Sequence, residues 1–222
     1  MNNSVIYTSI FGGYDRLRDP VVHSASIDYI CFTNDSKMSS DVWQIRVLDP
    51  HFPKDMTRSA RLPKICPHRF LGEYDYSLYI DGNMLLNVIP DVLALLEGKT
   101  IAIERHPKKR NCIYAEADAC KKSHRGNPKE IDKQTDIYRN MGVPKNVGLY
   151  VTWMIVRKHN DERLSILSEI WWEHLCSYSV RDQISFPVVF KDYPIASIPK
   201  SIRDEMVTRP TKAKHIARRN RY

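Results

Sequence analysis

The sequence lacks any apolar segment long enough to cross a membrane as a helix, which would take roughly 18 or more consecutive apolar residues. The longest early apolar run, Val5 to Phe11, is short and is interrupted by Thr8 and Ser9. A secretory signal peptide is also missing. We therefore expect a cytoplasmic protein with no integral membrane segment, or a fragment whose membrane anchor lies elsewhere.

Paired cysteines are also absent. The five cysteines are an odd number, are spread along the chain and contain no C-x-x-C pair. Disulfide frameworks and zinc ribbons are built from paired cysteines, so this pattern argues against both. We expect buried or inert thiols in a reducing compartment.

Glycine is scarce, at 8 of 222 residues, and no G-x-G-x-x-G motif occurs. This absence argues against a Rossmann dehydrogenase, which uses that motif to bind a dinucleotide. The pair Gly12-Gly13 does follow the first strand-like run and precedes Tyr14, whose ring could stack on a base. A lone glycine pair is a weak indication of nucleotide binding.

The composition is that of an ordinary globular domain, with 42% hydrophobic and 27% charged residues. We expect one domain over residues 1–222, ending in a basic segment, 209–222. The net charge is +8, which indicates an anionic partner. Nucleic acid, acidic lipid and a phosphorylated small molecule all fit that charge.

Strand-like and helical segments alternate along the chain. The β-branched and aromatic runs predict strands at Val5–Ile10, Asp28–Thr33, Val42–Leu48, Ser77–Ile80, Thr100–Ile103 and Leu149–Val156. Helices are predicted from an Asp55 cap to about Ile65, kinked or shortened by Pro63, and at Pro90–Leu96, Ile113–Lys122, Lys129–Asn140 and Asp161–Tyr178. This alternation predicts an α/β fold in which helices cover both faces of a central, mostly parallel sheet.

Ligands of such sheets bind at the carboxyl ends of the strands. The buried strand ending at Ile80 presents Asp81-Gly82-Asn83 there, with oxygen ligands two residues apart that suit Mg²⁺ or Mn²⁺ carrying a diphosphate. Gly82 would let a ligand approach the backbone closely. A plain Asp-Gly turn after a strand is the alternative interpretation.

Other polar residues are predicted to reach the same edge. Three cations are spaced three residues apart on the predicted helix: Arg58, Arg61 and Lys64. They would share one helix face that points toward Asp81. A solvated basic surface is the alternative interpretation. His106 follows a strand end, where a structural histidine is the alternative. Asp182-Gln183 could bind sugar hydroxyls or cap a helix.

Taken together, these segments resemble glycosyltransferases of the nucleotide-sugar-binding GT-A fold. The likeness is to the family of plant turgor-regulation and mucilage-related glycosyltransferases, and to an algal-virus glycosyltransferase that builds capsid glycans. The motifs that carry it are Tyr7-Thr8-x-Ile10-Phe11-Gly12-Gly13-Tyr14-Asp15, Tyr29-Ile30-Cys31-Phe32-Thr33, Tyr76-Ser77-Leu78-Tyr79-Ile80-Asp81-Gly82, His106-Pro107, Ile113-Tyr114-x-Glu116-Ala117 and Arg181-Asp182-Gln183.

The resemblance implies a role for each part of the site. Uracil and ribose would contact Thr8, Ser9 and Tyr14. The diphosphate and donor sugar would lie near Arg58, Arg61, Lys64 and Gly82, with Arg218 on the diphosphate. A Mn²⁺ or Mg²⁺ ion would be held by Asp81, Asn83 and His215, although Asn83 is a neutral residue where the family pattern has Asp. Catalytic contacts with the sugar would come from Asp182, Gln183 and His106.

The function that follows is a metal-dependent transfer of a hexose from a UDP-sugar, UDP-glucose first, to a glycan or glycoprotein acceptor, with retention of configuration. For a viral protein, the host cytoplasm would be the location. Two alternatives remain. A nucleotidyltransferase would use two or three strong carboxylates at its metal, where this site offers only Asp81. A nucleic-acid-binding protein would use the basic tail, whose only aromatic residue is Tyr222.

Overall fold

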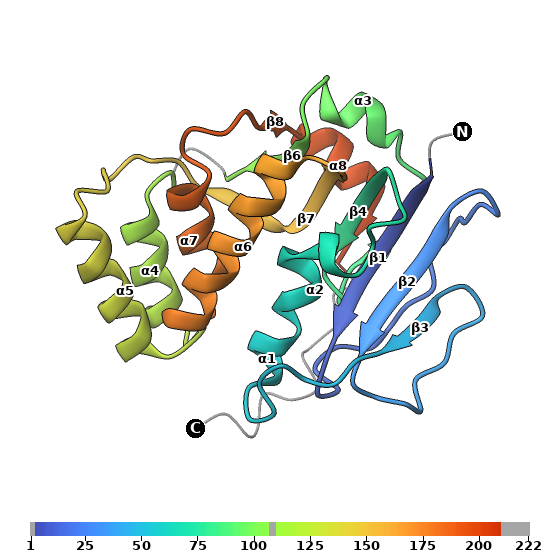
Figure 1. Ribbon diagram of the computed structural model, residues 1–222, viewed down its shortest axis with the longest axis horizontal. Coiled ribbons are helices and arrows are strands. Elements are labelled where there is room, and N and C mark those ends of the chain that lie inside the picture. Colours follow the sequence, from blue (N-terminus) through green and yellow to red (C-terminus); the bar gives the residue numbers. More distant parts are fainter. Residues whose placement is uncertain (1–2, 107–109, 210–222) are drawn as a thin grey trace.

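A computed structural model describes residues 3–106 and 110–209 of the chain (Figure 1). Within these residues, a seven-stranded sheet has the order β3-β2-β1-β4-β7-β6-β8. Its strands are β1 (Ser4–Ile10), β2 (Asp28–Thr33), β3 (Gln44–Val47), β4 (Tyr76–Ile80), β6 (Ile101–Arg105), β7 (Tyr150–Lys158) and β8 (Ala196–Ser197). Two short strands, β5 (Leu85–Leu86) and β9 (Val207–Thr208), pair separately in antiparallel fashion.

One reversed strand determines which loops meet at the edge of the sheet. All neighbouring strands pair in parallel except β7, which is antiparallel to both β4 and β6. The carboxyl ends of β1, β4 and β6 therefore share one edge, and β7 begins at that edge. The mostly parallel sheet agrees with the GT-A fold class expected from the sequence.

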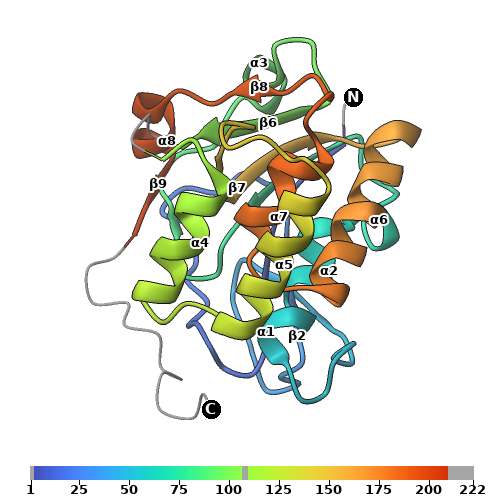
Figure 2. The ribbon, with the colours of Figure 1, turned by 90° about the vertical axis from the view of Figure 1, so that its left-hand side faces the viewer.

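Helices cover both faces of this sheet (Figure 2). The helical elements are α1 (Met56–Ser59), α2 (Arg61–Ile65), η1 (Pro67–Arg69), α3 (Val92–Leu96), α4 (Ile113–Lys122), α5 (Pro128–Asn140), α6 (Glu162–Ser177), α7 (Asp182–Val189) and α8 (Lys200–Met206). Apolar residues of α2, α6 and α7 pack on one face, and those of α3 and α8 pack on the other. A third apolar cluster joins α4 and α5 to α7.

The amphipathic helix α6 shows how the pattern produces the packing. Leu164, Trp171 and Leu175 are buried in one cluster against the sheet, and Leu167 packs beside them, as the spacing predicts. The helix begins after Asp161, whose carboxylate accepts a hydrogen bond from the backbone N–H of Leu164 at 2.7 Å. None of the helices within residues 3–106 and 110–209 combines the length and the apolar character needed to cross a bilayer.

The predicted elements are present, with ends within two residues of the observed ones, but the helix from Asp55 to Ile65 is divided. Asp55 does cap it, accepting a hydrogen bond from the N–H of Arg58 at 2.9 Å. The chain then breaks at Ala60 into α1 and α2. Pro63 has no N–H to donate to the carbonyl of Ser59, which accounts for the break. The prediction did not include η1, α7, β8, α8 or the two-stranded β5–β9 pair.

Gly82 has a packing role that the sequence did not predict. A Cβ atom at this position would lie 2.4 Å from Cγ1 of Ile10. The missing side chain therefore makes room for Ile10 of β1, and the close approach is a packing contact between two chain segments. Gly82 also lines the cavity described below, so close approach of a ligand to its backbone stays a prediction.

We predict that Gly82→Ala lowers the free energy of unfolding by about 1–3 kcal/mol, the usual cost of overpacking a core. Urea denaturation would measure it. The matched control is Gly72→Ala, where the nearest atom to the added Cβ is 3.7 Å away. An unchanged stability in Gly82→Ala would contradict the packing role.

Candidate active site

A cavity of about 1000 Å³ lies at the edge where the carboxyl ends of the strands meet. The turns after β1 and β4, the start of β7, the helix α2 and the start of α7 contribute to its walls, with the α4–α5 loop and the α8–β9 segment. The cavity brings together most of the residues predicted for the site: Ser9, Tyr14, Arg61, Lys64, Asp81, Gly82, Asn83, Asp182 and Gln183.

Ion pairs around Lys64 form the centre of this cavity. The Lys64 side chain is 1% exposed, and its Nζ lies 2.6 Å from Oδ2 of Asp182 and 3.3 Å from Oδ1 of Asp81. Arg61 lies 3.6 Å from each of these carboxylates. Because the four residues come from α2, the end of β4 and the start of α7, two cations and two carboxylates are held close together.

Burial and charge together set the ionisation of this cluster. Burial alone would raise the pKa of Asp182, whose side chain is 3% exposed, but Arg61 and Lys64 outweigh it and hold that pKa well below its ordinary value. Burial alone would likewise lower the pKa of Arg61, and Asp182 and Asp81 raise it instead. The cluster therefore keeps Asp182 ionised at neutral pH.

Asp81 and Asn83 have the donor chemistry that a divalent cation needs. Oδ1 of Asp81 accepts a hydrogen bond from the hydroxyl of Tyr79 at 2.9 Å and also contacts Lys64 and Arg61. Within the described part of the chain, no donor contacts the other oxygen, Oδ2, of this side chain, which is 26% exposed. One open carboxylate oxygen and a nearby amide oxygen fit Mg²⁺ or Mn²⁺.

The helix α7 begins at Asp182 with Arg181 as its N-cap residue and without a side-chain capping hydrogen bond, so the capping interpretation of Asp182-Gln183 is not confirmed. Asp182 is the first residue of the helix, and its Oδ1 accepts a hydrogen bond from the N–H of Gln183 at 3.0 Å. The side-chain amide of Gln183 donates to the carbonyl oxygen of Tyr150, also at 3.0 Å. Both residues line the cavity, so the turn that starts the helix also faces the ligand space.

Three residues predicted for the site lie elsewhere. Thr8 is buried within β1 and does not line the cavity, which is lined from the next residue, Ser9, onward. Arg58 faces away from Asp81, since the break at Ala60 separates α1 from α2, and its guanidinium donates to Glu130 at 3.2 Å.

His106 is the third. The backbone N–H of His106 donates a hydrogen bond to the backbone carbonyl of Leu149 beyond the end of β6. His106 does not line the cavity. The remaining predicted residues, His215 and Arg218, lie outside the described residues.

Sequence reasoning missed part of the cavity wall. Trp153 on β7 and Arg203 on α8 both line it, with the Arg203 guanidinium 5.3 Å from the Trp153 ring centroid and 3.3 Å from Glu104. Trp153 lies in a predicted strand next to the site, which was an available signal. Arg203 had none, because α8 was not predicted. Arg125 and Arg181 add two further cations.

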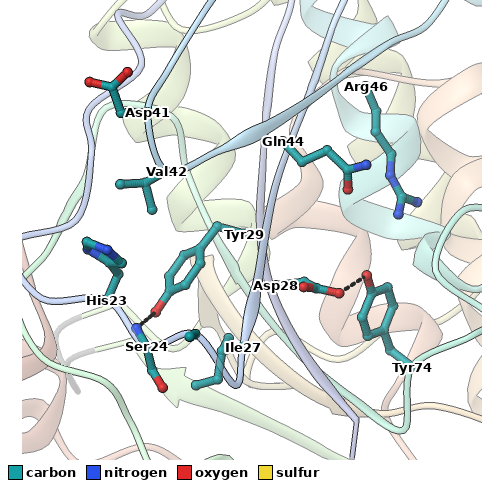
Figure 3. A pocket seen from close by; sticks show the side chains of 11 residues that line it. His23, Ser24, Ile27, Asp28, Tyr29, Asp41, Val42, Gln44, Arg46 and Tyr74 are labelled. Carbon is teal, nitrogen blue, oxygen red and sulfur yellow. Dashed lines mark hydrogen bonds between the residues drawn. The ribbon is translucent and has the colours of Figure 1, made fainter.

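A second hollow, of about 590 Å³, lies at the opposite end of the strands (Figure 3). It is lined at the start of β2 by Asp28 and Tyr29, and their hydrogen bonds join neighbouring segments: Tyr74 donates to Asp28 at 2.6 Å, and Tyr29 accepts from the N–H of Ser24. Because ligands of parallel sheets bind at the carboxyl ends, the larger cavity is the candidate active site.

The sequence matches the family described as "TOD1/MUCI70, glycosyltransferase-like domain" over residues 1–200. It is 26% identical over 216 residues to the Arabidopsis thaliana protein named "Probable hexosyltransferase MUCI70", covering 83% of this chain and 36% of that protein. The chain thus spans about a third of the length of this relative. Among solved structures, the apo structure of the bifunctional glycosyltransferase WbbM matches with a TM-score of 0.49 at 11% identity, covering 89% of this chain and 39% of WbbM.

We predict that Asp182→Asn lowers the free energy of unfolding at pH 7 by about 3–5 kcal/mol, because it removes a buried counter-charge from Lys64 and Arg61. The matched control is Asp192→Asn, which removes an exposed carboxylate 3.8 Å from Lys191 and should change the free energy by about 1 kcal/mol at most. Urea denaturation of both variants tests this.

The same variant tests the pH dependence. The folded-state pKa of Asp182 lies below the unfolded value of about 3.9. Its contribution to stability is therefore present above that pH and is lost as the pH falls through the folded-state pKa. The stability gap between wild type and Asp182→Asn should be smaller at pH 3 than at pH 7. An equal gap at both would show that the charge does not contribute.

Proposed function

The chain belongs to the TOD1/MUCI70 glycosyltransferase-like domain family, and from this premise we propose that it transfers a hexose from a UDP-sugar to a glycan or glycoprotein acceptor. UDP-glucose is the proposed donor, and the product keeps the donor's anomeric configuration. The observation that carries the proposal is the cavity in which Asp81 and Asp182 surround the buried cations Lys64 and Arg61.

The nucleotide would bind at the end of β1. Ser9 lines the cavity, and its hydroxyl is buried without a hydrogen-bond partner among the described residues. A buried polar group in that state is stabilised by a ligand that supplies the missing hydrogen bond. The ring of Tyr14, which lines the same end of the cavity, would stack on the uracil.

The diphosphate would lie between Asp81 and the cations of α2. A divalent ion, Mn²⁺ or Mg²⁺, would be held by Asp81 and Asn83, with His215 as a third ligand; when bound, it would neutralise charge on the leaving diphosphate. Arg61 and Lys64 would stabilise the same charge as it develops, and Arg218 would assist them. Because ion pairs already hold Arg61 and Lys64 in place, little reorganisation would be needed during the reaction.

The sugar would lie against the start of α7. Gln183 uses its amide nitrogen to bind the carbonyl of Tyr150, which leaves its amide oxygen to accept from a sugar hydroxyl. Asp182 would act through its negative charge in two ways. Its carboxylate holds Lys64 in place, and it stabilises the oxocarbenium-like sugar of the transition state.

We predict that Asp81→Asn abolishes the Mn²⁺-dependent part of UDP binding, because it replaces the one carboxylate proposed as a metal ligand with a weaker neutral ligand. Calorimetric titration with UDP, with and without Mn²⁺, measures this. The control is Asp118→Asn, on an exposed carboxylate of α4 paired with Lys121. Equal Mn²⁺ dependence in wild type and Asp81→Asn would remove Asp81 from the metal site.

We also predict that UDP-glucose is preferred over UDP-galactose. Gln183→Ala should lower turnover about 10- to 100-fold, because a sugar hydroxyl left without its hydrogen-bond partner costs about 1–3 kcal/mol. UDP affinity should fall far less, because UDP carries no sugar. With methanol as acceptor, NMR of the methyl glycoside identifies the anomer. An inverted product would overturn retention, and an equal loss of UDP affinity would overturn the sugar contact.

A further inference from the structure

A buried tyrosine donates a hydrogen bond to the carboxylate proposed to bind the metal. Tyr79 is on β4 two residues before Asp81, is 2% exposed, and donates its hydroxyl to Oδ1 of Asp81 at 2.9 Å. The other two groups at this oxygen, Lys64 and Arg61, are cations. Tyr79 is therefore the neutral donor among the described groups that contact Oδ1.

The Tyr79 ring is fixed from two sides. Its register partner on β1 is Tyr7, whose ring packs edge-on at 5.2 Å between centroids. On the side of α2, Nζ of Lys64 lies 5.0 Å from the Tyr79 ring centroid. With both neighbours in place, the hydroxyl has little freedom to leave Asp81.

Tyr7 connects this arrangement to the core of the sheet. Its hydroxyl accepts a hydrogen bond from the buried guanidinium of Arg157 at 3.2 Å and donates to the backbone carbonyl of Lys64 at 3.4 Å. The two tyrosines thus contact the two central residues of the site: Tyr7 contacts the backbone of Lys64, and Tyr79 contacts the carboxylate of Asp81.

We propose that Tyr79 is a positioning residue for a divalent cation: it holds Oδ1 of Asp81 and so leaves Oδ2 as the oxygen that binds the ion. The role rests on the proposed function, because the cation is the one that accompanies the nucleoside diphosphate. A neutral donor suits this task, since it orients the carboxylate without adding positive charge that would repel the metal. Lys64 and Arg61 contact the same oxygen but carry that charge.

The test is Tyr79→Phe, which keeps the ring and removes the hydroxyl. Changing a residue that orients a metal ligand typically costs 10–100-fold in metal affinity. We expect Mn²⁺ affinity in the presence of UDP, measured by the EPR signal of the free ion, to fall about 10-fold or more. UDP affinity measured without Mn²⁺ should be unchanged.

The chain offers a matched control in Tyr74→Phe. Tyr74 is also buried and donates to a carboxylate, Oδ2 of Asp28 at 2.6 Å, but at the other end of the strands (Figure 3). This variant should leave Mn²⁺ affinity unchanged. Thermal unfolding of both variants shows whether any loss of affinity simply follows a loss of stability.

A second readout does not depend on a substitution that removes the hydroxyl. With 3-fluorotyrosine at position 79, the ¹⁹F resonance should shift when Mg²⁺ is added to the UDP complex, and the same label at position 74 should not respond. The outcomes are distinguishable. Wild-type protein that binds neither UDP nor Mn²⁺ would overturn the proposed function. Wild-type binding with unchanged Mn²⁺ affinity in Tyr79→Phe, or an equal loss in Tyr74→Phe, would overturn the role of Tyr79.

Discussion

A single buried ammonium group joins three of the chain segments that line the candidate active site. Nζ of Lys64, on α2, contacts Asp182 at the start of α7 and Asp81 at the end of β4. A charge buried to this degree is tolerated only with counter-charges close by, so the three segments are held in fixed relation. The break at Ala60 and the proline in α2 matter for this reason, because they determine which cations of that segment reach the carboxylates.

The same constraint prepares the site for the proposed chemistry. Burial removes Arg61 and Lys64 from bulk water, and both are paired with a carboxylate of the protein itself. Electrostatic groups that are fixed before the reaction stabilise developing charge without reorganising, which is where most of their catalytic value lies. Family membership and the cavity thus support glycosyl transfer on separate grounds, one from sequence and one from the arrangement of charge.

The fold was largely predictable because its signals are local. The β-branched and aromatic runs predicted the principal strands, and Asp55 and Asp161 identified helix starts. Asp81 was predictable because a carboxylate at the end of a buried strand must lie at the sheet edge. Three residues were placed in the site but do not line the cavity. The position of Arg58 depends on the break at Ala60, and that of Thr8 on how far along β1 the cavity reaches. The position of His106 depends on its backbone hydrogen bond to Leu149 beyond β6.

Other parts of the site depend on tertiary contacts alone. Arg203 comes from a short helix with no strong sequence pattern, and its place over Trp153 follows from packing. From the sequence, Tyr79 is an ordinary core residue of a buried strand. Its hydrogen bond to Asp81 connects it to the site. Such contacts join residues through space, so single-sequence periodicity carries no trace of them.

The central claim is that the nucleotide-sugar binds in the cavity at the carboxyl edge of the sheet. Backbone amide NMR during titration with UDP-glucose and Mg²⁺ tests it most directly. The account predicts that the largest shift changes fall on Gly12 to Tyr14 and on Asp81 to Asn83. Changes centred on Ser24 to Tyr29, at the hollow of Figure 3, or no change at saturating ligand, would contradict it.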